Sequence, residues 1–354
     1  MSGLILPGAR GRPVATAQLT CYAIGDDGDQ RKGLAQKYTV LSTGQYSGTV
    51  NLDVPEYAAA TLSFTAATKT IADSASGLAS VKTGDTIRIV GSVSNDGVYT
   101  VATGGVAGAV VVNESLVDEV AGAYITICKR VSKSNNCVLD QNTLKMWMRY
   151  SSYGDLVGAA SDGKMNWYNA ATCYTLHPAA ADLAMVAGNI LRITGTDEHT
   201  RFFAGEVLFC SGFANAVNNL PGLRVLSVSY VGGNTDIVVD PGNQVLVAEV
   251  AGGSRAIKVV CSNIFAYAAA ACAAALGGYT DWRVPNINEA NSIRDCEQPN
   301  ARPDAVAFPT WVSSYYWTAT TKANGTTSAE LCAYGGGGSN DVKTANDYLV
   351  LVRG

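Results

Sequence analysis

The sequence predicts an α+β fold in which one mixed domain is interrupted by two homologous, small all-β insertions. Short β-type runs separated by turns fill residues 55–127, and runs in the same order return in residues 183–260. The remaining segments, 1–54, 128–182 and 261–354, contain both helix-like and strand-like patterns. We therefore expect these three segments to form the interrupted domain.

Corresponding residues identify the two insertions as copies of one unit. Residues 84–91, GDTIRIVG, correspond to residues 205–212, GEVLFCSG, and residues 117–122, VDEVAG, correspond to residues 247–252, VAEVAG. In the first copy, the Asn-Asp-Gly sequence at 95–97 follows a β-type run and predicts a hairpin. We expect each copy to fold as a small antiparallel β unit.

Helix signals lie outside the two insertions. The alanine-rich run at 264–276 predicts a helix that the glycine pair at 277–278 ends. Asn286 is a suitable N-cap for a second helix, and Glu289, three residues later, would complete a capping box. The apolar periodicity of residues 165–176 predicts a third, core-facing helix.

The segment between the first two helices predicts a rigid junction. Asp281 and Arg283 are two residues apart in an extended segment, so their side chains point to the same side. They can anchor the segment through charge-assisted hydrogen bonds. Trp282 then points to the opposite side, into the core.

Residues 278–286, GYTDWRVPN, carry a resemblance to a known family. Further stretches agree with it in the same order: 22–29 (YAIGDDGD), 138–147 (VLDQNTLKMW), 316–320 (YWTAT) and 350–354 (VLVRG). Together they resemble the C-terminal domain of the Legionella collagen-like adhesin, a group found in bacterial surface and phage proteins. The resemblance implies that the interrupted domain has a C-type-lectin-like fold. The family usually has a Gly between Thr143 and Leu144 and a Ser pair after Trp317, and this chain departs from both.

The resemblance also implies where a ligand would bind. In C-type-lectin-like folds the loops between the late strands form an exposed ligand face, and here those loops lie in residues 313–354. Trp317 belongs to the strand that supports them. The polar residues of these loops are the candidate contacts: Lys322, Asn324, Thr326, Glu330, Tyr334, Asn340, Asp341 and Lys343.

Metal binding is predicted at one place only, and no other cofactor is expected. Asp26, Asp27 and Asp29 surround a glycine and resemble half of a Ca²⁺ loop, although a solvated turn is the ordinary alternative. A complete loop also needs a distant bidentate acid, which the sequence does not identify. Residues 297–300, Glu-Gln-Pro-Asn, come close to a sugar-binding Glu-Pro-Asn motif but have one residue too many.

Composition argues against several classes of protein. Only 15% of the 354 residues are charged, the formal net charge is -4, and Lys and Arg are scattered, so nucleic-acid binding is not expected. No run is long and apolar enough to predict membrane insertion, and no signal peptide is expected at the start. The nine cysteines are an odd number without C-x-x-C spacing, which favours buried free thiols.

No catalytic constellation emerges from the sequence. A nucleophilic cysteine needs a base, but His177 and His199 lie in polar contexts without a partner motif. The formylglycine-generating oxidases share the lectin-like architecture and use a late cysteine pair. Cys296 and Cys332 are the available pair in this chain, but the sequence motifs of that family are missing.

We therefore expect a non-enzymatic structural protein displayed on a phage particle, as a tail-fibre, receptor-binding or head-decoration component. Such a protein would be assembled into virions in the host cytoplasm. Its partners would be other virion proteins and a host-surface protein or glycan, and we expect a homo-oligomer. Two alternatives remain open, a bacterial surface adhesin and an oxidase of the formylglycine-generating type.

Overall fold

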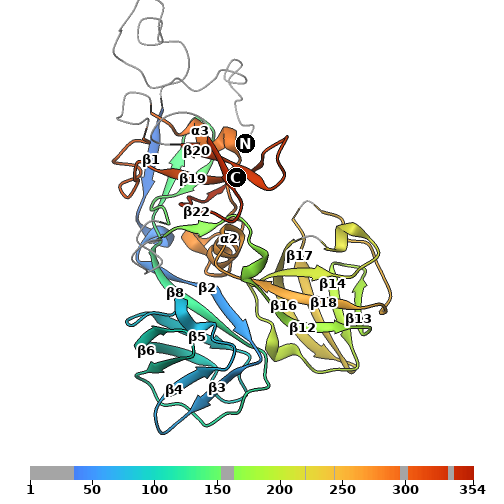
Figure 1. Cartoon of the computed structure of the whole chain (residues 1–354). Coiled ribbons are helices and arrows are strands. Elements are labelled where there is room, and N and C mark those ends of the chain that lie inside the picture. Colours follow the sequence, from blue (N-terminus) through green and yellow to red (C-terminus); the bar gives the residue numbers. More distant parts are fainter. Residues whose placement is uncertain (1–35, 153–162, 220, 243, 296–301, 334–338) are drawn as a thin grey trace, which may run out of the picture.

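Three units meet around one helix in the computed structural model, which describes residues 36–152, 163–219, 221–242, 244–295, 302–333 and 339–354 (Figure 1). Two units are seven-stranded sheets. We call residues 49–134 the first β unit and residues 173–260 the second β unit. The other described residues form the central unit, which contains helix α2 and both chain ends of the described part.

The prediction of an α+β fold with a C-type-lectin-like domain is wrong. About 45% of the chain is in strands and about 12% in helix, and the strands form several antiparallel sheets. The described residues contain two α-helices, α2 (Ile264–Ala273) and α3 (Ile287–Ser292). The chain is mostly β because even the central unit pairs its segments in small sheets.

The two β units have the same topology. Each sheet places its first and last strands side by side and adds the remaining strands in one order, so every strand of one unit has a counterpart in the other. The first unit has the order β2 (Thr49–Ala59), β8 (Ile125–Ser134), β5 (Thr86–Val90), β6 (Gly97–Val106), β7 (Ala109–Val112), β4 (Thr70–Asp73) and β3 (Leu62–Thr65). The second has β12 (Cys173–Ala180), β18 (Arg255–Val260), β15 (Val207–Ser211), β16 (Pro221–Val231), β17 (Asn234–Asp240), β14 (Ile190–Thr194) and β13 (Leu183–Val186).

Equivalent glutamates hold equivalent loops in the two β units. Glu119 forms an isolated backbone bridge with Phe64, and Glu249 forms the same bridge with Met185. Both carboxylates accept hydrogen bonds from the loop that follows β5 or β15. Burial raises the pKa of Glu249, but the N–H groups of Asn215 and its neighbours outweigh this and lower it to about 2. The hairpin predicted at residues 95–97 is confirmed, because β5 pairs with β6.

The central unit joins segments that are far apart in the sequence. Its largest sheet has four strands in the order β1 (Tyr38–Leu41), β9 (Cys137–Asp140), β10 (Met146–Met148) and β23 (Val352–Arg353). A second sheet contains β19 (Tyr315–Thr321), β20 (Ser328–Ala333) and β21 (Ser339–Val342), and a third pairs β11 (Met165–Asn166) with β22 (Asn346–Asp347). The 3₁₀ helices in the described residues are η1 (Gly44–Tyr46), η2 (Leu78–Ser80), η3 (Ala170–Thr172), η4 (His199–Arg201), η5 (Ala216–Asn219) and η6 (Leu276–Gly278).

Two of the three predicted helices are confirmed. Helix α2 begins after Asn263, whose side chain accepts a hydrogen bond from Ala266 N–H, and α3 begins after Asn286 with the capping box to Glu289 in place. The helix predicted at residues 165–176 is wrong. That segment contains β11, η3 and the start of β12, since its backbone pairs with β22 and β18 instead of with itself.

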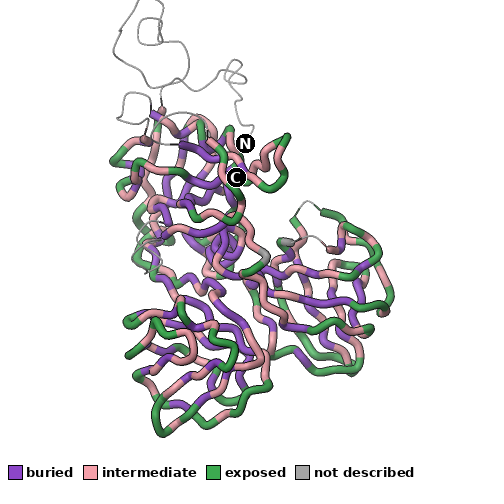
Figure 2. The backbone as a smooth tube through the Cα atoms, viewed as in Figure 1, coloured by how far each residue is buried: buried purple, intermediate pink, exposed green. Residues whose placement is uncertain are grey.

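Each unit has its own buried core (Figure 2). In the central unit the core is built on fully buried Trp147, Trp317 and Tyr267 of α2. The units also touch one another: the rings of Tyr57 and Tyr174 pack edge to face with centroids 4.8 Å apart. Helix α2 lies where the three units converge (Figure 1).

Candidate binding site

Residues 281–283, which we call the Asp-Trp-Arg segment, attach β23, the closing strand of the chain, to the central unit. Trp282 is 4% exposed and its Nε1–H donates to the Leu276 carbonyl at 2.7 Å. Asp281 accepts two hydrogen bonds from Arg353, at 2.6 Å from Nε and 3.1 Å from Nη2. Arg283 forms an antiparallel backbone bridge with Val352. The side chains of Asp281 and Trp282 and the backbone of Arg283 therefore all hold this segment in place.

Glu289 is the charged centre of this junction. Its two carboxylate oxygens accept from Arg283 Nη1 and Nη2, each at 2.7 Å, and Lys145 Nζ lies 2.8 Å from Oε1. The Asn286 backbone N–H donates to Oε2 at 2.9 Å. Burial raises the pKa of this carboxyl, but the contacts with Arg283, Lys145 and Asn286 outweigh burial and lower the pKa to about 2. The junction is therefore an ionised network at neutral pH.

The sheet β19-β20-β21 brings three of the predicted contact residues together. Glu330 and Asn340 are direct cross-strand partners, so their side chains share one face of the sheet. Lys322 Nζ donates to Asn340 Oδ1 at 3.1 Å, which places the ammonium on that face. Asn324 and Thr326 are exposed in the turn between β19 and β20. We call Lys322, Glu330 and Asn340 the outer face.

Two other predicted contact residues lie elsewhere. Asp341 is paired with buried Ala329, so it points to the side opposite the outer face. Lys343 packs its Nζ 3.9 Å from the centre of the Trp167 ring and donates to Thr321 Oγ1 at 3.0 Å, and burial lowers the pKa of its amine. Tyr334 lies outside the described residues. The structure therefore divides the predicted set between two sides of one sheet.

Asp347 is a buried carboxyl beside this site that the sequence analysis missed. It is 5% exposed, and its Oδ2 has no hydrogen-bond partner among the described residues. Burial, assisted by the nearby charge of Asp341, raises the pKa of Asp347 to about 6, and Lys164 opposes the shift. The one sequence signal was an acidic residue beside the apolar closing run of residues 348–352.

The described residues contain no group of three or more His, Cys, Asp and Glu side chains that could hold a metal ion. Asp26, Asp27 and Asp29 lie outside the described part, as do residues 297–300, so the structure leaves both predictions untested. His177 is buried in β12 between Glu198 and Asp182, each 2.9 Å away, rather than in a polar loop. Burial lowers the pKa of His177, but the two carboxylates raise it above its usual value.

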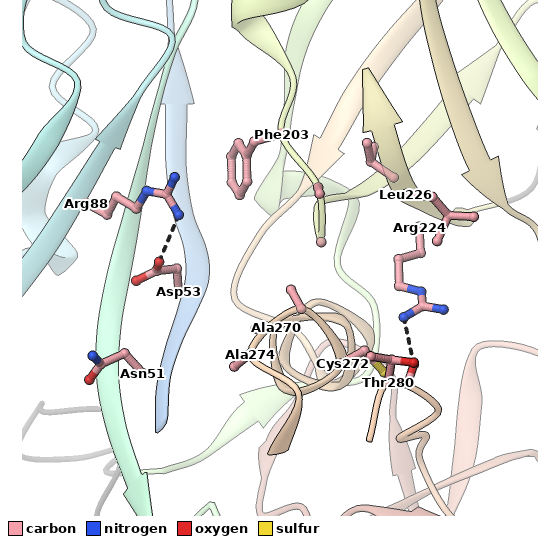
Figure 3. A pocket seen from close by; sticks show the side chains of 14 residues that line it. Asn51, Asp53, Arg88, Phe203, Arg224, Leu226, Ala270, Cys272, Ala274 and Thr280 are labelled. Carbon is pink, nitrogen blue, oxygen red and sulfur yellow. Dashed lines mark hydrogen bonds and ion pairs between the residues drawn. The ribbon is translucent and has the colours of Figure 1, made fainter. Parts of the chain in front are cut away.

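A pocket of about 460 Å³ opens where the three units meet (Figure 3). Asp53 and Arg88 line its first-unit wall, while Phe203 and Arg224 come from the second unit and Ala270 from α2. Each charged side chain in its lining is already paired, Asp53 with Arg88 and Arg130, and Arg224 with Asp240. The pocket therefore presents paired charges around an apolar floor.

The described cysteines give no reactive pair. Cys332 is buried in β20, and the other member of the candidate pair, Cys296, lies outside the described residues. Neither α-helix in the described part has the length and apolar composition needed to span a membrane.

The carboxyl-terminal part of the chain is similar to a known protein family. Residues 244–353 match the model of the Lcl C-terminal domain family. This is the family expected from the motifs, and the matched range includes Trp282, Trp317 and the whole outer face. The match suggests an adhesin-like function. No curated protein and no solved structure matches the chain significantly.

Proposed function

We propose that the chain, whose residues 244–353 match the Lcl C-terminal domain family, is a non-enzymatic, adhesin-like binding protein displayed on a phage particle. The outer face of Lys322, Glu330 and Asn340 makes the contact with a host-surface protein or glycan. The observation that carries this proposal is that the matched family domain contains these three polar side chains together on one accessible face.

The outer face is suited to binding because it is held in place before a ligand arrives. Asn340 accepts a hydrogen bond from the Lys322 ammonium, and Thr318 Oγ1, on the neighbouring strand, donates to the backbone carbonyl of Glu330 at 2.7 Å, which holds the strand that carries Glu330. Positioned donors and acceptors lose little conformational entropy on binding. Polar contacts of this kind give specificity without any covalent step.

The β units support display on a particle. They extend from the central unit in two directions (Figure 1). Each unit also has an exposed valine at an equivalent position. Val120 is 85% exposed and Val250 is 87% exposed, each directly after the loop-holding glutamate of its unit. We propose that these two loops contact neighbouring virion proteins or other copies of this chain, which would cover the apolar side chains.

Immunogold labelling of particles purified from the source culture tests this function. We expect label on the particles, at tail tips or fibres for a receptor-binding protein and over the head for a decoration protein. Label on the bacterial cell envelope, with none on particles, would overturn the phage assignment and favour a bacterial surface adhesin, which the family match also supports.

A further inference from the structure

Glu206 is a carboxyl buried where the two β units meet. It directly precedes β15 and is 0% exposed. Its Oε2 accepts from the Phe203 backbone N–H at 3.2 Å, and its Oε1 lies 3.4 Å from the hydroxyl of Thr126, which belongs to β8 of the first β unit. The preceding residue, Gly205, faces Ala273 at the end of α2. Glu206 is therefore at the point where all three units converge.

The first β unit contains the same turn with Asp85 in place of Glu206. In both turns the acid's backbone carbonyl accepts from a valine N–H, Val101 in one unit and Val225 in the other. In both, the carboxylate accepts from the backbone N–H three residues earlier, Lys82 for Asp85 at 2.8 Å. The duplicated fold therefore provides an internal comparison for Glu206.

The comparison shows that the second unit has no cation at the position of Lys129. Lys129 Nζ lies 3.3 Å from Asp85 Oδ2, and both side chains are buried. Lys129 is the cross-strand partner of Ile87, two residues after Asp85. The residue in the same register of the second unit, opposite Leu208, is Val259. A valine thus stands where the first unit has its counter-ion.

Within the described part of the chain, no other element supplies a positive charge to Glu206. The buried thiols of Cys128 on β8 and Cys261 after β18 interact electrostatically with Glu206 and carry no positive charge. Helix α2, IFAYAAAACA, contains no Lys, Arg or His. The charged groups around the adjacent pocket are paired among themselves: Asp53 with Arg88 and Arg130, and Arg224 with Asp240, while Glu56 accepts from Ser262.

We propose that Glu206 is a proton-dependent latch, whose neutral carboxyl holds the second β unit against the first and whose ionisation loosens the contact between them. An ionised carboxylate here would be desolvated without a cation, which is costly, so a loosened junction that admits water becomes favourable. In the first unit, the Asp85 and Lys129 pair allows the same turn to stay closed with an ionised acid.

The direction of the pH effect follows from the burial. Burial raises the pKa of Glu206 from its ordinary 4.5 to about 8, and the hydrogen bonds from Phe203 and Thr126 offset only part of this shift. Between these values the folded chain holds a proton that the unfolded chain releases. Its folded-to-unfolded ratio therefore falls up to about tenfold per pH unit as the pH rises through this range. Above about pH 8 the folded state itself is ionised, and the loosening reaches its full extent.

Cys128 and Cys261 are native probes of the latch. The alkylation rate of each cysteine by a neutral maleimide would be measured by mass spectrometry on the full chain between about pH 6 and about pH 9, for the wild type and Glu206→Gln. Comparing the two proteins at each pH removes the ionisation that the thiols share. An ionised Glu206 also raises the pKa of both thiols, which slows alkylation of the wild type and so works against the expected rise. We expect the ratio of the wild-type rate to the Glu206→Gln rate to rise at least about tenfold between about pH 6 and about pH 9 at both cysteines. At Cys332, in the core of the central unit, it should stay near one, which separates local loosening from global unfolding.

Two further variants complete the experiment. Asp85→Asn changes the matched acid of the first β unit. At Cys128 and Cys261 it should keep the rise of the alkylation rate with pH relative to Glu206→Gln, which we call the alkaline step, because Glu206 is unchanged. Val259→Lys places a cation beside Glu206, as Lys129 lies beside Asp85, and should abolish the alkaline step. If this variant does not fold, the comparison of the wild type with Glu206→Gln still tests the proposal. A ratio that stays constant with pH at Cys128 and Cys261, or a step that disappears in Asp85→Asn as well, would overturn the proposal.

Discussion

The Arg283 guanidinium meets the Glu289 carboxylate with two parallel hydrogen bonds of 2.7 Å each. The same carboxylate caps α3 through Asn286 and contacts Lys145 from the strand region before β10. The Glu289 side chain thus connects the Asp-Trp-Arg segment, the start of α3 and the residue before β10. This explains how a domain assembled from separated segments keeps a fixed closing strand.

Replacing Glu289 with Gln should destabilise the chain by roughly 2–4 kcal/mol at neutral pH, because Arg283 and Lys145 lose a shared, poorly exposed partner. Since the folded-state pKa of Glu289 is about 2, below its ordinary 4.5, the wild type has this stabilisation above about pH 4.5 and loses it as the pH falls toward 2. Urea unfolding at several pH values measures both effects. The matched control is Asp281→Asn, whose side chain is 55% exposed and should cost about 1 kcal/mol or less. Equal losses for the two variants would contradict this explanation.

Replacing Gly205 with Ala should open the contact between the second β unit and α2. A Cβ at this position would lie 2.6 Å from the Cβ of Ala273, in a backbone conformation with φ of +94°. Gly188→Ala is the control, because its φ is +87° and nothing lies within 4 Å of an added Cβ. Both variants should lose about 1–2 kcal/mol for the backbone strain. Gly205→Ala should lose about 1–3 kcal/mol more for the steric clash. Similar melting temperatures for the two variants would show that the units do not approach this closely in solution.

Asp347→Asn should stabilise the chain at neutral pH. Because burial raises the folded-state pKa of Asp347 to about 6, the stability of the wild type falls as the pH rises from about 4 to 6, and the variant removes that slope. We expect the variant to be more stable by about 2 kcal/mol at pH 7 and about equal to the wild type near pH 4. Asp341→Asn, which removes the neighbouring negative charge, should reduce the slope only in part. A wild-type slope that persists in Asp347→Asn would show that another group titrates in this range.

The described cysteines should react slowly in the native chain. Burial raises the pKa of Cys137 and of Cys210 to about 12, so little thiolate is present at neutral pH. Alkylation at pH 7.5 should be at least about a hundredfold slower at these positions than in urea-unfolded chain. Rapid and selective modification of Cys332 would instead favour an oxidase-like cysteine chemistry.

Local signals in the sequence predicted local structure correctly. The capping box of α3 needs only Asn286 and Glu289 three residues apart, and the hairpin between β5 and β6 needs only its Asn-Asp-Gly turn. Residues 165–176 have a helical period but form strands, because their partners in β22 and β18 lie about 90 to 180 residues away in the chain and outweigh local propensity.

The candidate site depends on strand register, which the sequence does not display. Register places Glu330 beside Asn340 and turns Asp341 to the other side, although all three were equal candidates in the sequence. Register also places Lys129 near Asp85 and Val259 near Glu206, a difference between the two repeats that alignment of their acidic turns alone does not reveal. The assignment of the outer face as a contact surface stays a prediction.

Binding of the fluorescently labelled full chain to a panel of intact bacterial strains tests the central claim most directly. We predict saturable binding to at least one strain and a loss of at least about tenfold in affinity, equal to about 1.4 kcal/mol, for Lys322→Ala combined with Asn340→Ala. Lys37→Ala, which removes an exposed lysine elsewhere in the central unit, should bind like the wild type. No binding of the wild type to any strain, or unchanged binding by the outer-face variant, would contradict the account.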